Sequence, residues 1–216
     1  MRRYKYQLVT VIGFTTMLLF GCASQPPLSV GQLTEYNAVS INKDVSVPSI
    51  AFYHGQVQSF AGVFGVLGAL ATMDDAKSNG IQLAEFMKKE NINVGEIFIK
   101  DFEKQIIETK TFKVVQPNSE KAIFKTKIEL FGLNQGNGLT STLYPQLTVS
   151  AQLTKLDGTI LWKGQQYITP INSENNIGDT LENFYKEPNK LRLSFEKTSH
   201  ILAKFLIEEI IGSKTQ

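Results

Sequence analysis

The chain has few of the residues from which catalytic and metal centres are built. Its 216 residues include one cysteine, Cys22, and two histidines, His54 and His200. No second histidine or cysteine lies close to either histidine along the chain, as the ligands of a zinc site usually do, and no serine stands in a G-x-S-x-G sequence. The sequence therefore predicts no catalytic, no cofactor-binding and no metal-binding residue, and we expect a protein that is not an enzyme.

The chain also lacks an uncharged run at its start that is long enough to cross a membrane as a helix. The N-terminal run from Leu8 to Phe20 has thirteen residues, whereas a spanning helix needs about 20. Arg2, Arg3 and Lys5 precede it, and a short basic stretch followed by an apolar stretch is the pattern of a signal peptide. We therefore predict a signal peptide over residues 1–21.

The end of this stretch reads Leu19-Phe20-Gly21-Cys22 and resembles the lipobox of bacterial lipoproteins. The resemblance implies that Cys22 carries a diacylglycerol on its thiol and an acyl chain on its amine after cleavage, and these are the only added groups we expect. Two or three acyl chains, at roughly 0.8 kcal/mol per buried CH₂, give a durable membrane anchor. No aspartate follows Cys22, so for a Gram-negative cell the resemblance implies the periplasmic face of the outer membrane.

Charge gives no reason to expect a nucleic-acid partner. The 22 basic residues include three within the predicted signal peptide, which leaves 19 against 20 acidic residues. A mature protein this close to neutrality gives no electrostatic reason to propose nucleic acid as a partner. With Cys22 lipidated no disulfide is possible, so the fold must rest on its core.

The domain organisation follows from composition. Residues 22–43, which contain Pro26 and Pro27, show little apolar periodicity and are predicted to form a lipidated tether. We expect a single α/β domain over residues 44–212 and a short tail over 213–216.

One uncharged segment, residues 59–72, contains Gly62, Gly65 and Gly68. It has three interpretations: a buried loop or helix start, a helix that self-associates through small residues four apart, or a segment that contacts a membrane or lines a pore. We treat the three glycines as candidate assembly or membrane-contact residues.

The rest of the chain predicts an α+β fold. Apolar residues at helical spacing predict amphipathic helices over Val94–Thr109, opened by Asn93 and Glu96 as a capping box, and from Leu191 to Gly212. Strands at 122–133, 147–153 and 159–168 predict a three-strand antiparallel meander, with a type I′ hairpin at Asp157-Gly158. We expect an antiparallel-rich mixed sheet packed by two or more such helices, with Trp162 in the core.

This order of elements, together with the lipobox, resembles periplasmic α/β modules of the TolB N-terminal, LpoB and CsgG type, whose modules bind proteins or form rings. The resemblance implies an accessory or assembly factor of a cell-envelope complex, anchored in the membrane and bound to a protein partner. The alternative is a homo-oligomeric secretion or pore-forming lipoprotein that uses residues 59–72. An envelope hydrolase whose carboxylates converge only in the folded chain is the third hypothesis.

Overall fold

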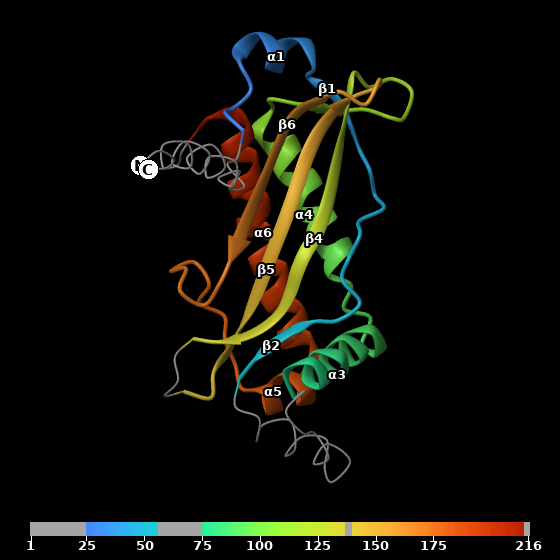
Figure 1. Cartoon of the computed structure of the whole chain (residues 1–216). Helices are drawn as coiled ribbons and strands as arrows, with labels where there is room; N and C mark the ends of the chain where they lie inside the picture. Colours follow the sequence, from blue (N-terminus) through green and yellow to red (C-terminus); the bar gives the residue numbers. More distant parts are fainter. Residues whose placement is uncertain (1–24, 56–74, 137–139, 214–216) are drawn as a thin grey trace, which may run out of the picture.

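A computed structural model describes residues 25–55, 75–136 and 140–213 of the chain. In chain order its elements are α1 (Val30–Glu35), β1 (Ala38–Ile41), β2 (Phe52–His54), α3 (Asp75–Lys89), α4 (Val94–Thr109), β3 (Lys113–Val114), β4 (Ala122–Gln135), β5 (Leu143–Lys155), β6 (Ile160–Ile168), α5 (Leu181–Lys186) and α6 (Pro188–Ile211). The predicted α+β class is confirmed, and α4 and α6 lie together on one face of the sheet (Figure 1).

The sheet has six strands in the order β3-β1-β4-β5-β6, with β2 beside the far half of β4. The predicted meander is confirmed, because β4, β5 and β6 pair antiparallel in sequence. Both β1 and β2 pair parallel to β4, at its first and last residues respectively. Between them Ser46 bridges to Lys127, so residues 38–54 run along β4 as one interrupted strand.

The predicted tether is wrong for residues 25–43. These residues contain α1 and β1, and β1 is an internal strand between β3 and β4. Val39 of β1 is fully buried. The prediction failed because a four-residue strand is too short to show alternation, and its partners lie more than seventy residues away in the chain.

The two predicted helices are confirmed, with one local correction. Asn93 begins α4, and its side-chain oxygen accepts hydrogen bonds from the backbone N–H groups of Gly95 and Glu96. Glu96 accepts from the side-chain amide of Asn93 and not from its backbone, so half of the expected capping box is replaced by a side-chain pair. Helix α6 ends at Gly212, whose φ of +71° is the left-handed conformation that glycine adopts readily.

The hairpin between β5 and β6 forms where predicted, but with another turn. A type I′ turn needs a positive φ at both central residues, and of the Asp157-Gly158 pair only Gly158 has one, at +87°. The N–H of Lys155 donates to the carbonyl of Thr159 at 2.8 Å. The loop therefore has three residues, 156–158, with glycine in the left-handed position.

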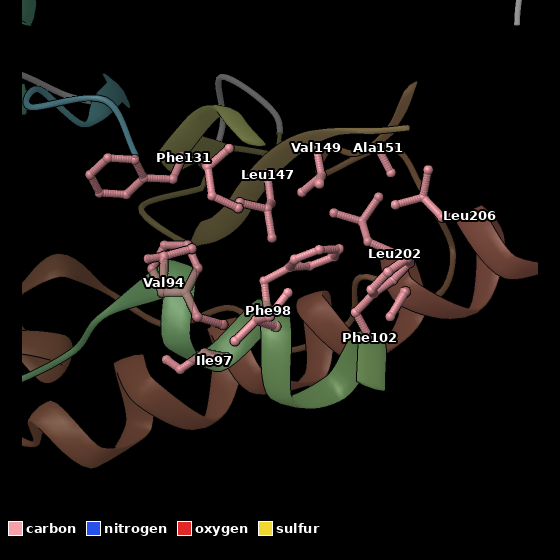
Figure 2. Packing of buried hydrophobic residues seen from close by; sticks show 14 of the residues in the cluster. Val94, Ile97, Phe98, Phe102, Phe131, Leu147, Val149, Ala151, Leu202 and Leu206 are labelled. Carbon is pink, nitrogen blue, oxygen red and sulfur yellow. The ribbon is translucent and has the colours of Figure 1, made fainter. Parts of the chain in front are cut away.

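The core lies between the sheet and the pair α4 and α6. On β5 the predicted alternation holds, since Leu147, Val149, Ala151 and Leu153 are all buried. Figure 2 shows the side chains of this face opposite residues of α4 and α6: Leu147, Val149 and Ala151 against Val94, Ile97, Phe98, Phe102, Leu202 and Leu206. Trp162 is fully buried, as predicted.

Candidate functional site

The residues predicted to carry function from the sequence lie outside the part of the chain that the structure describes. Cys22 is three residues before the first described residue, Gln25. Gly62, Gly65 and Gly68 fall in the range 56–74, between β2 and α3. The described residues next to these two segments, residues 1–24 and 56–74, define where each segment joins the domain.

The chain enters the fold at Gln25. Its backbone N–H donates to the carbonyl of Lys163 on β6 at 3.3 Å, and its side-chain oxygen accepts from the N–H of Lys163 at 3.1 Å. Three residues later the N–H of Leu28 donates to the carbonyl of Ile210 near the end of α6 at 2.9 Å, and the Leu28 side chain is buried. Gln25 and Leu28 are therefore fixed to β6 and α6.

This attachment limits the position of Cys22. Three residues of extended chain span at most about 10 Å, so Cys22 lies within about 10 Å of Gln25. Lys163 pairs with Gln152, and Gln152 pairs with Lys125. Gln25, beside Lys163, therefore lies near the end of the sheet at which β4 begins.

We call this end of the molecule the α1 end, and it consists of α1, the 110–122 connection and the β5–β6 loop. Its parts are joined by hydrogen bonds: the N–H of Lys113 donates to Asn37 and that of Lys121 to Ala38. The Lys155 ammonium lies 5.2 Å from the centre of the Tyr36 ring. Figure 1 shows α1 and this loop together at the top of the molecule.

The sequence did contain a signal for α1. Ser29 and Gln32 form a capping box, in which the Ser29 hydroxyl accepts from the Gln32 N–H while the Gln32 side chain accepts from the Ser29 N–H. Leu28 and Leu33 flank it at the spacing of a hydrophobic staple, and both belong to the core or pack on it. The S-x-x-Q sequence after Pro27 predicts a helix start that composition alone concealed.

The second face of the meander is polar, and we call it the open face. Cross-strand neighbours on it include Lys127, Ser150 and Gln165 in one row and Lys125, Gln152 and Lys163 in the next. Among the described elements, no helix covers this face, and α4 and α6 lie behind the sheet in the view of Figure 1. A solvent-facing sheet of this kind offers hydrogen-bonding side chains over three strands.

One carboxylate on the open face is held in place by two neighbours. The Lys127 ammonium lies 2.7 Å from Glu129, and the Ser150 hydroxyl donates to the other oxygen of Glu129 at 2.7 Å. The hydrogen bond from Lys127, followed by that from Ser150, holds the pKa of Glu129 below its ordinary value against the opposing effect of burial. Glu129 is therefore ionised, and its charge is balanced by Lys127.

The histidines do not form a catalytic arrangement in the described part of the chain. His54 is exposed at the end of β2. His200 on α6 lies 4.0 Å from Asp101 and 3.5 Å from the Gln105 amide, both on α4. Burial raises the pKa of Asp101, and the nearby His200 opposes that rise. This group joins two helices at the surface.

The chain contains two sequences of the form S-x-x-K, Ser40–Lys43 and Ser194–Lys197. The Ser194 hydroxyl is buried and donates to the Leu191 carbonyl, while Lys197 pairs with Asn176. Lys43 pairs with Glu103 of α4. Neither serine has its lysine as a hydrogen-bond partner, so neither is activated as a nucleophile by this geometry.

Within residues 25–55, 75–136 and 140–213, no three histidine, cysteine or acidic side chains gather as metal ligands would. The helices of the same ranges include none that is both long and apolar enough to cross a membrane.

Comparison with known proteins gives only distant likenesses. The sequence matches no family model and no curated protein. Among solved structures, protein XCC0632 of Xanthomonas campestris, from the family DUF330, is 10% identical with a TM-score of 0.42, and the alignment covers 88% of this chain and 93% of that one. The PelC dodecamer of Paraburkholderia phytofirmans is 12% identical with a TM-score of 0.34, covering 87% and 92%.

The lipoprotein GNA1162 of Neisseria meningitidis is 14% identical with a TM-score of 0.26, covering 61% of this chain and 81% of that one. All three TM-scores are below 0.5, so these likenesses assign the chain to no family. The functional argument below therefore depends on the chain's own residues.

Proposed function

We propose that the protein is a lipid-anchored lipoprotein of the bacterial cell envelope that acts without catalysis, as an accessory or assembly factor that binds a protein partner. The observation that carries the proposal is the attachment of Gln25 and Leu28 to β6 and α6. Because Cys22 lies three residues before Gln25, acyl chains on Cys22 hold the folded domain directly at the bilayer. For a Gram-negative cell we place it on the periplasmic face of the outer membrane.

The open face supports a binding role. It spans β4, β5 and β6 and presents amide, hydroxyl and ammonium groups such as those of Gln152, Ser150 and Lys125. These groups sit on paired strands, so a partner meets a surface that is already ordered and loses little conformational entropy on binding. Exposed polar side chains on a rigid sheet suit a non-obligate protein interface, which is about as polar as the rest of a surface.

The anchor is tested by labelling cells with radioactive palmitate. We expect label in the unaltered chain and none in Cys22→Ala, because no other cysteine exists. Ser24→Ala is the matched control, since it lies outside the lipobox and should label normally. Palmitate on the Cys22→Ala variant would refute the anchor.

The partner surface is tested by placing a photo-crosslinking amino acid at Gln165 on the open face. The control position is Lys104, which is exposed on α4 behind the sheet. We expect a crosslink to a second protein from Gln165 and none from Lys104. Crosslinks from Gln165 to another copy of this chain would favour the homo-oligomeric alternative, and none from either position would contradict binding through this face.

A further inference from the structure

Three apolar side chains at the α1 end are exposed to solvent, which is unfavourable for them. Val30 at the start of α1 is 81% exposed, and Leu156 and Ile160 around the β5–β6 loop are 62% and 47% exposed. Each costs free energy in water in proportion to its apolar area. Single exposed apolar residues are common on protein surfaces, so exposure alone identifies no partner.

The proposed lipid anchor on Cys22 indicates which partner covers these side chains. Ile160 lies three residues along β6 from Lys163, to which Gln25 is hydrogen-bonded. Three residues of strand span about 10 Å, which equals the reach of the three residues between Gln25 and Cys22. The chain between Gln25 and Cys22 is therefore long enough to bring the lipid attachment site to the level of the exposed loop.

We infer that the α1 end is a membrane-docking surface, and that Val30, Leu156 and Ile160 rest in the headgroup layer of the bilayer in which Cys22 is anchored. This inference rests on the proposed lipid anchor. The headgroup layer is about 5 to 7 Å thick on each side of the hydrocarbon core, so a loop at the level of the anchor enters it. The β6 edge is the other surface within reach, but Gln165, the outward residue after Lys163, is polar, and the exposed Tyr167 lies farther from Gln25.

Charge contributes little to this docking. The charged residues of the α1 end are Lys110, Lys113, Lys121 and Lys155 together with Glu35, Glu120 and Asp157. These groups nearly cancel, so attraction to anionic lipid is weak at this surface. We therefore expect docking on neutral and on anionic vesicles alike.

The test uses the lipidated full-length mature protein in phosphatidylcholine vesicles that contain a doxyl-labelled lipid quencher. Because Cys22 carries the lipid, Leu156→Cys, Ile160→Cys and Ile171→Cys each add a single free thiol for an environment-sensitive fluorophore. Ile171, which is 91% exposed, is the matched control. It follows β6, whose nine residues span about 30 Å from Ile160.

We expect the fluorophores at positions 156 and 160 to be quenched about two-fold more than that at 171, as for groups buried about 5–10 Å into the interface. Adding Leu156→Glu to the Ile160→Cys protein should lower its quenching. The result should not change when phosphatidylglycerol replaces part of the phosphatidylcholine.

Equal, weak quenching at all three positions in a palmitate-labelled protein would overturn the docking and leave the lipid anchor standing. Equal, strong quenching would mean that the domain lies along the bilayer, and would also overturn it. Failure of palmitate labelling would remove both the anchor and the docking. A blue shift at position 156 that depends on protein concentration, without lipid quenching, would assign this surface to a protein contact instead.

Discussion

The substitution Leu28→Ala tests whether the chain close to the lipid belongs to the folded domain. Leu28 is 6% exposed, and its backbone N–H is bonded to Ile210 of α6. Replacing a buried leucine by alanine costs about 2–5 kcal/mol, with the lower values at sites where the surroundings can close over the cavity. Leu28 lies near the chain end, so we expect a loss of about 2–3 kcal/mol.

The loss can be measured by urea unfolding of the mature chain carrying Cys22→Ser, so that no lipid is present. Trp162 is fully buried and is the only tryptophan, which makes its fluorescence a reporter of the core. With a slope of about 2 kcal/mol per molar urea, the midpoint should fall by about 1 M.

Val30→Ala is the matched control, because Val30 lies two residues away and is 81% exposed. Substitutions at such surface positions usually change stability by about 0.5 kcal/mol or less. If Leu28→Ala unfolded at the same urea concentration as Val30→Ala, residues 25–29 would be a tether, and the anchor would not fix the orientation of the domain.

Two more substitutions test the open face and the packing of α3. Lys127 and Ser150 stabilise the ionised carboxylate of Glu129 in the folded chain, and this stability is lost as the pH falls below the ordinary pKa of about 4.5. Glu129→Gln should therefore flatten the fall in the free energy of unfolding between pH 5 and pH 3, measured by urea midpoints. An unchanged slope would contradict this. Gly80→Ala should cost about 1–3 kcal/mol by overpacking, because a Cβ there would lie 2.0 Å from the carbonyl oxygen of Ala51; a melting temperature equal to that of the unaltered chain would disprove this close approach.

The parts of the fold that were predictable from sequence are those with a long repeat of one period. Helix α4 shows apolar residues at helical spacing over sixteen residues, and the first eleven residues of β5 alternate between buried and outward positions. Each pattern repeats several times, so a buried face is specified without knowledge of the partner element. The meander followed because β5 and β6 are joined by a short loop.

Strand β1 and the type of the β5–β6 turn could not be predicted in this way. Four residues of β1 hold two periods of alternation at most, and the strand is stabilised by β3 and β4 far along the chain. In the hairpin, Asp157-Gly158 suits both a two-residue and a three-residue loop. The register of Leu153 and Thr154 against β6, which shifts by one residue, decides between them.

Of the two candidate surfaces, the open face could be predicted in part from the sequence and the α1 end could not. The polar half of the open face was visible in the alternation of Thr148, Ser150 and Gln152, since every second side chain of a strand shares a face. The α1 end was not visible, because Val30, Leu156 and Ile160 come from two segments that are far apart in the sequence and meet where Lys155 lies over the Tyr36 ring. Apolar residues scattered in sequence become one surface only when the topology brings their segments together.

The attachment at Gln25 also affects how the protein would present the proposed binding surface. A flexible tether of about twenty residues would let the domain wander by about 25 Å in root-mean-square terms, and any face could then meet a partner. With the proposed lipid on Cys22, three residues before Gln25 and its partner Lys163, the open face instead begins close to the membrane. It extends along β4 from Ala122 to Asn134, about 40 Å. We therefore expect the proposed partner to meet this face in one orientation and within a limited distance of the bilayer, as the proposed accessory role requires.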